Sequence, residues 1–109
     1  MIQFSELFRA KDINAGIRAY RNTPDAVLLD VRTEEEYIDR HIPTALNIPL
    51  DELEKVTEAV PDRNPPLFVH CLSGARSETA VVALKKMGYT HVTNIGGIRD
   101  FDGKVERGE

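Results

Sequence analysis

One cysteine in this chain, Cys71, is followed by residue types that favour nucleophilic chemistry. Gly74 stands three positions later and Arg76 five positions later. A cysteine thiol becomes a nucleophile when it ionises, and its pKa falls from about 8.5 to roughly 3.5–7.5 beside cations or at helix N-termini. The glycine lets the backbone curl so that its N–H groups converge on one point, and the arginine adds a fixed positive charge. The pattern predicts a cysteine nucleophile inside a loop that binds anions.

We expect this loop to hold a substrate mainly through its backbone. Apart from Arg76, which we expect to fold back onto the loop or a bound anion, its side chains are small or neutral. Ser77 is the expected N-cap of the next helix, whose positive end would attract anions. We expect the Cys71 thiol to be exposed and to contribute little to packing. The predicted substrate-binding and anion-binding residues are Leu72, Ser73, Gly74, Ala75, Arg76 and Ser77.

A buried structural cysteine is the alternative interpretation, and it is the commoner fate of a lone cysteine. That interpretation gives no reason for a glycine, an arginine and a serine at these spacings. The chemical interpretation is therefore favoured.

The elements around the loop are expected to place it at the end of a buried strand. Residues 65–69 form an apolar run opened by prolines, and residues 78–87 read as a helix closed by Gly88. Further strands are expected at 2–4, 26–31, 45–48 and 91–95, and further helices at 13–21, 34–40, 52–59 and 98–101. Strands that alternate with helices predict an α/β fold of three layers, α/β/α, around a mostly parallel five-stranded sheet. Ligands bind such sheets at the carboxyl ends of the strands.

Helix start signals account for several acidic residues between the strands, including the glutamate triplet at 34–36. Asp12 and Asp51 are expected N-caps, and Thr33 with Glu36 forms a capping box. The glutamate triplet 34–36 is assigned to this helix start because no His or Cys stands near it at metal-ligand spacing. We expect neither a metal nor an organic cofactor.

Three histidines are placed too poorly to act as a base for Cys71. His70 precedes Cys71 on an extended segment, so its side chain should point to the opposite face and pack under a helix. We expect His41 to fix its turn by hydrogen bonding and His91 to be exposed. A cysteine–histidine pair of the protease kind is therefore disfavoured, and the loop itself must activate the thiol.

Composition limits the partners and the compartment. The 109 residues suit one domain, residues 1–109, with a core at about 12–101 and a frayed polar tail at 102–109. A formal charge of −4 argues against nucleic-acid partners, and no apolar run approaches the ~20 residues of a membrane span. A single cysteine and the lack of a secretory signal pattern favour a cytoplasmic protein. Composition does not fix the oligomeric state, and a monomer is favoured.

Three ordered stretches resemble the rhodanese (sulfurtransferase) family. Residues 71–77, CLSGARS, resemble its active-site loop, and residues 94–98, NIGGI, resemble its closing segment. Between residues 30 and 49 the pattern of Asp30, His41 and Pro49 with their neighbours resembles its upstream signature. The resemblance implies a sulfurtransferase that carries sulfur as a persulfide on Cys71. Thiosulfate or a protein persulfide would be the donor, and a thiol or cyanide the acceptor.

The chain departs from the family pattern at three positions. Arg40 and Thr44 stand where the family commonly has glycine, and Phe101 stands where it usually has tryptophan. A non-glycine residue held at positive φ costs of order 1 kcal/mol. No departure removes a group expected to take part in the chemistry.

Two other functions stay open. Phosphotyrosine-type phosphatases and arsenate reductases on related folds also place a cysteine in an anion loop, but the phosphatase loop has five residues between Cys and Arg. Here four residues, 72–75, separate them, and the smaller ring suits a sulfur atom better than a phosphoryl group. The second alternative is a sulfur-carrying or regulatory binding module with negligible turnover.

Overall fold

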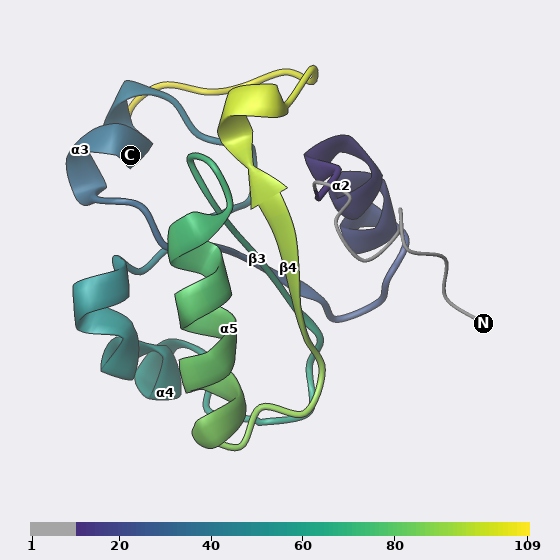
Figure 1. Cartoon of the computed structure of the whole chain (residues 1–109), viewed down its shortest axis with the longest axis vertical. Coiled ribbons are helices and arrows are strands. Elements are labelled where there is room, and N and C mark those ends of the chain that lie inside the picture. The colour runs from purple at the N-terminus through teal and green to yellow at the C-terminus, as the bar shows by residue number, and fades with distance from the viewer. Residues whose placement is uncertain (1–10) are drawn as a thin grey trace.

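The computed structural model describes residues 11–109, and these form a parallel sheet between two layers of helices (Figure 1). The sheet order is β2-β1-β3-β4, and all three strand pairs are parallel. The strands are β1 (Val27–Asp30), β2 (Leu46–Asn47), β3 (Leu67–Cys71) and β4 (Val92–Gly97). The fold class is as predicted, with four strands in the described residues. The strand expected at 2–4 lies outside them.

The helices divide between the two faces of the sheet. They are α2 (Ile13–Arg21), α3 (Glu34–Asp39), α4 (Val56–Ala59) and α5 (Ala75–Lys86), with 3-10 turns η1 (Leu50–Lys55) and η2 (Ile98–Asp100). Helix α2 covers one face, whereas α5, α4 and η1 cover the other (Figure 1).

Each face of the sheet has its own apolar core. On the α5 side, Val69 and Cys71 of β3 pack with Leu84 of α5. On the α2 side, Ile13 and Ile17 pack with Leu28 of β1. Alternate residues of a strand point to opposite faces, so the even-numbered residues of β3 belong to the α2 side.

Local start signals operate as predicted at two helices. The Asp12 carboxylate accepts hydrogen bonds from the backbone N–H groups of Asn14 and Ala15, at the start of α2. Thr33 and Glu36 form the expected capping box at the start of α3. Both signals act within one helical turn, which is why the sequence alone reveals them.

Two other helix starts were predicted wrongly. Asp51 caps no helix, because the chain first turns as η1 behind Pro49 and kinks at Glu52 before α4 begins. Helix α5 begins at Ala75, three residues before the predicted start at residue 78, because Gly74 at φ +101° turns the chain directly into the helix. Ser77 therefore lies inside the first turn and is not the N-cap. The closing glycine, Gly88, has the left-handed φ of +101° expected after a helix.

The polar tail is paired where the sequence predicted fraying. Glu106 and His41 exchange two backbone hydrogen bonds of 2.8 Å, and the Gly108 N–H donates to the Ile38 carbonyl. The backbone N–H and carbonyl of His41 are the partners of the tail. Composition predicts a frayed tail because it does not reveal that these groups lie within reach. Within residues 11–109, no helix combines the length and the apolar character needed to cross a bilayer.

Candidate active site

Strand β3 delivers Cys71 to the carboxyl edge of the sheet, where the chain turns into α5. The residue is 1% exposed and packs in the apolar core on the α5 side. The expectation of an exposed thiol was therefore wrong: as the last residue of a central strand, Cys71 points inward with Val69, and the loop closes over it.

Hydrogen bonds converge on the sulfur. The Gly74 N–H donates to Cys71 Sγ at 3.0 Å, and the Ser77 hydroxyl lies 3.5 Å from the same atom. Burial raises the pKa of the Cys71 thiol, but the Ser77 hydroxyl and the N–H groups of Ser77, Gly74 and Ser73 outweigh it and bring the pKa below its ordinary value. The loop therefore favours a thiolate without a nearby histidine.

Glycines of β4 let the loop lie directly against the sheet. A Cβ on Gly97 would stand 2.0 Å from the Leu72 carbonyl oxygen, a backbone atom that cannot move independently. That oxygen also accepts the N–H of Arg99 at 3.1 Å. The shape of the loop is thus set by a close approach to Gly97 as well as by the left-handed Gly74.

Asn94 of β4 fastens the loop to the start of α5, a role that the sequence did not reveal. Its amide group donates to the Gly74 carbonyl at 3.1 Å and to Glu78 at 2.9 Å. Its side-chain oxygen lies 2.7 Å from the Ser77 hydroxyl, so that it and the Cys71 sulfur are alternative acceptors for the one hydroxyl proton. Asn94 stands in the stretch that resembles the family's closing segment, and this position was the only sequence signal for it.

Arg76 pairs with a glutamate of α3, a partner that the sequence did not reveal. Its guanidinium makes two hydrogen bonds to the Glu36 carboxylate, at 2.7 and 2.9 Å. The Arg76 hydrogen bond lowers the pKa of Glu36 to about 2 and correspondingly raises the pKa of Arg76. Glu36 thus serves both the capping box and the loop, and it neutralises the cation expected to bind anions.

The outer rim of the loop is mostly neutral. Leu72 is 38% exposed, and Ser73 and Ala75 are also exposed.

A pocket of about 280 Å³ lies beside Arg76. It is lined by Val31, Thr33, Leu50, Asp51 and Arg76. Since Asp30 pairs with His70 in the sheet, Val31 follows at the level of Cys71, and the pocket opens at the same edge of the sheet.

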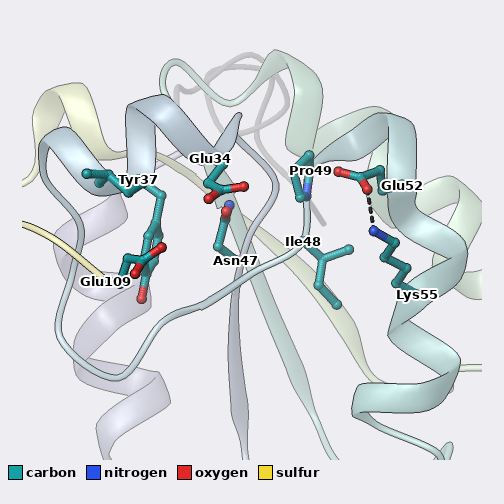
Figure 2. A pocket seen from close by; sticks show the side chains of 9 residues that line it. Glu34, Tyr37, Asn47, Ile48, Pro49, Glu52, Lys55 and Glu109 are labelled. Atoms are coloured by element: carbon teal, nitrogen blue, oxygen red, sulfur yellow. Dashed lines mark hydrogen bonds and ion pairs between the residues drawn. The ribbon is translucent and has the colours of Figure 1, made fainter.

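A second pocket, of about 320 Å³, lies between α3 and η1 over Asn47 and Ile48. Figure 2 shows Tyr37 and Glu109 on one side of it and the paired Glu52 and Lys55 on the other. Its lining contains no cysteine or histidine. Residues 11–109 contain no group of three His, Cys, Asp or Glu side chains placed to hold a metal ion.

The histidines lie as predicted. His70 is fully buried on the face opposite Cys71, and His91 is exposed. His41 Nδ1 lies 2.8 Å from the Tyr37 carbonyl oxygen, and its ring stacks on Tyr37.

None of the three departures from the family pattern makes a hydrogen bond to the Cys71 sulfur. Arg40 is extended at φ −166° and carries no strain. Thr44 is left-handed at φ +73°, and its hydroxyl is hydrogen-bonded to that of Tyr20 at 2.8 Å. Phe101 packs against the core on the α2 side.

Comparisons with known proteins agree with this arrangement. The family model for the rhodanese-like domain matches residues 15–104. Thiosulfate sulfurtransferase PspE of Escherichia coli (strain K12) is 47% identical over 74 residues, which cover 67% of this chain and 71% of PspE. YrkF of Bacillus subtilis (strain 168), named as a candidate sulfur carrier protein, is 44% identical over 80 residues, which cover 72% of this chain and 43% of YrkF. This chain therefore spans less than half the length of that relative.

A solved structure described as "rhodanese with anions from E. coli" superimposes with a TM-score of 0.71 at 42% identity and covers 76% of this chain and 99% of that one. The fold and the loop define a parallel α/β domain with a cysteine at the carboxyl edge of its sheet. The chain belongs to the family of rhodanese-like domains, and its enzyme class is that of the rhodanese-type sulfurtransferases.

Proposed function

We propose that this protein transfers a sulfane sulfur through a persulfide formed on Cys71. The observation that carries the proposal is the set of N–H and hydroxyl groups directed at the Cys71 sulfur, in a loop that opens onto a helix N-terminus. These groups stabilise negative charge on sulfur, first as a thiolate and then as a persulfide. The family and its named sulfurtransferase relative supply the reaction class.

The proposed reaction has two displacement steps. The Cys71 thiolate attacks the outer sulfur of thiosulfate, an S–S bond to Cys71 forms, and the S–S bond of thiosulfate breaks to release sulfite with the electron pair. A nucleophilic acceptor, a thiolate or cyanide, then attacks the terminal sulfur. The S–S bond to Cys71 breaks, and the thiolate is restored. This is covalent catalysis that needs no metal or organic cofactor.

The remaining loop residues are proposed to bind and orient the sulfur. Backbone N–H groups of Leu72, Ser73, Gly74, Ala75 and Ser77 supply the electrostatic stabilisation. Arg76 orients the loop through Glu36, and its charge reaches a bound anion only weakly because the carboxylate is paired with it. The pocket beside Arg76 gives a small organic acceptor a route to this edge of the sheet.

We propose a low-molecular-weight or protein persulfide as the faster donor and thiosulfate as a slower one. The acidic chain repels a dianion at long range, and the local cation is neutralised. A persulfide donor carries less charge and meets less repulsion. Thiosulfate turnover is therefore expected with a high KM.

Thiocyanate formation from thiosulfate and cyanide tests the proposal. Wild-type protein should show ping-pong kinetics, and Cys71→Ala should form no thiocyanate above the background reaction. Alanine is the better replacement, because Cys71 is buried and a serine hydroxyl there would need a new partner. Turnover by Cys71→Ala at a rate near that of the wild type would exclude the covalent mechanism.

The same assay separates the alternatives. A sulfur carrier would accept one sulfur without turning over small donors, an outcome favoured by the paired Arg76 and by the likeness to YrkF. A phosphatase or arsenate reductase would act on phosphate esters or arsenate, for which the four-residue spacing leaves a smaller ring.

We propose a cytoplasmic protein, because an unpaired cysteine nucleophile suits a reducing compartment. We also propose that the protein is a monomer. Fractionation of expressing cells and sedimentation of the purified protein test both points. Recovery from an oxidising compartment or as a stable dimer would contradict them.

A further inference from the structure

His70 is a buried side chain that takes no direct part in the proposed reaction, yet its ring contacts the backbone of Cys71. It is 0% exposed, and its Nδ1 atom lies 3.1 Å from the carbonyl oxygen of Cys71. Its Nε2 atom has no hydrogen-bond partner among residues 11–109. A buried polar atom without a partner is uncommon in folded proteins and calls for a functional or structural reason.

The contact with the carbonyl determines which nitrogen carries the proton. A carbonyl oxygen only accepts hydrogen bonds, so the neutral imidazole must be protonated at Nδ1. Nε2 then carries a lone pair, 3.8 Å from the Asp30 carboxylate on the neighbouring strand.

Asp30 cannot turn to satisfy His70, because Arg32 holds it. The Arg32 guanidinium donates to both Asp30 oxygens, with its shortest contact at 2.8 Å, and both side chains are buried. Asp30 and Arg32 are the charged groups that act on His70. Burial lowers the pKa of His70 and outweighs the attraction of Asp30, so the ring stays neutral near pH 7.

The hydrogen bond from His70 to the Cys71 carbonyl fixes the orientation of the Cys71–Leu72 peptide, where the loop begins. The peptide between Cys71 and Leu72 is planar, so holding its oxygen sets the direction in which the chain leaves β3. Two residues after Leu72, the backbone must bring the Gly74 N–H to 3.0 Å from the Cys71 Sγ atom. A rotated Cys71–Leu72 peptide would move that donor away from the sulfur.

We propose that His70 is a positioning residue, which in its Nδ1-protonated form anchors the Cys71 carbonyl and thereby keeps the loop N–H groups on the sulfur. The proposal rests on Cys71 as the nucleophile. It predicts that the donor at Nδ1, rather than the volume or polarity of the ring, sets the ionisation of the thiol.

Two amide variants separate these properties. The amide nitrogen of asparagine occupies the place of Nδ1, whereas that of glutamine reaches the place of Nε2. The rate of Cys71 alkylation by iodoacetamide against pH gives the ionisation midpoint. His70→Gln should raise this midpoint by about half to one unit, the equivalent of one ordinary hydrogen bond, and His70→Asn should restore most of the wild-type value. His91→Gln, at an exposed histidine, is the matched control and should change nothing.

Equal midpoints in wild type and His70→Gln would overturn the proposal, and so would equal shifts in the glutamine and asparagine variants. Nitrogen-15 NMR of histidine-labelled wild type gives a test that needs no variant. It should show His70 protonated at Nδ1 and bare at Nε2, and protonation at Nε2 alone would overturn the proposal. Because alkylation reads thiol ionisation without sulfur transfer, its outcome is independent of whether the protein proves to be a sulfurtransferase.

Discussion

Charge at single residues decides how strongly the loop attracts an anion. Arg76 is the one cation of residues 71–77, and Glu36 accepts both of its hydrogen bonds. The loop is left with N–H dipoles and the neutral side chains of Leu72, Ser73 and Ala75. Such a site stabilises charge on sulfur but adds little to the capture of a dianion from solution.

Ala75→Lys should lower the KM for thiosulfate, because the exposed position at the start of α5 would place a second cation beside the loop. Steady-state kinetics with cyanide as acceptor measure the change. Ala59→Lys is the matched control, since it adds the same net charge at the end of α4, away from the loop (Figure 1). If both variants lower KM equally, the effect belongs to net charge and not to the loop.

Glu36→Gln should reduce stability in a pH-dependent way. Glutamine keeps the capping interaction with Thr33 but loses the ion pair, for a loss of about 1 kcal/mol at pH 7. The folded-state pKa of Glu36 is lowered from its ordinary 4.5 to about 2, so the contribution is present above about pH 4.5 and disappears as pH falls towards 2.

The difference in unfolding temperature between wild type and Glu36→Gln, measured from pH 7 to pH 2, should shrink across that range. Glu35→Gln, at an exposed neighbour, should show no such trend. A difference that stayed constant with pH would show that the ion pair does not stabilise the fold.

At the scale of elements, β4 shapes the loop as much as the loop's own sequence does. Gly97 allows the Leu72 carbonyl to approach, and Asn94 binds Gly74, Ser77 and Glu78 together. A register shift between β3 and β4 at Val69 and His70 precedes this contact. The active loop is therefore supported by a strand that is distant in the sequence.

Gly97→Ala should displace the loop and reduce sulfur transfer by at least tenfold, because the new methyl group would overlap backbone atoms of Leu72 and Ser73. Gly103→Ala provides the control. The three atoms nearest to its Cβ would all belong to the Phe101 ring, a side chain, rather than to the backbone. Comparable activity of both variants in the thiocyanate assay would contradict the role assigned to Gly97.

Sequence reasoning succeeded where the cause is local and failed where it spans the fold. Asp12, Thr33 and Gly88 act within one turn, and the structure confirms their helix boundaries. Arg76 finds Glu36 across 40 residues, and no local pattern predicts that pairing, since Glu36 already had a sufficient role in its own helix. The depth of Cys71 was misjudged for a similar reason: the loop that buries it takes its shape from β4.

The whole molecule adds a long-range field to the local one. Its formal charge of −4 opposes a dianionic donor during approach, whereas the loop around the buried Cys71 attracts it only at contact. Donor capture and sulfur stabilisation are thus separate properties in this protein.

Raising ionic strength should increase kcat/KM for thiosulfate, because salt screens the long-range repulsion more than the buried contacts. A neutral donor gives the matched comparison and should respond little. A fall in kcat/KM with salt would mean that attraction near the loop outweighs the charge of the whole protein.

Intact mass spectrometry of the purified protein after treatment with thiosulfate is the direct test of sulfur transfer through Cys71. Since Cys71 is the only thiol, the protein should gain one sulfur atom, which cyanide removes and which Cys71→Ala does not acquire. An unchanged mass in the wild type, or an equal gain in the alanine variant, would contradict sulfur transfer through Cys71.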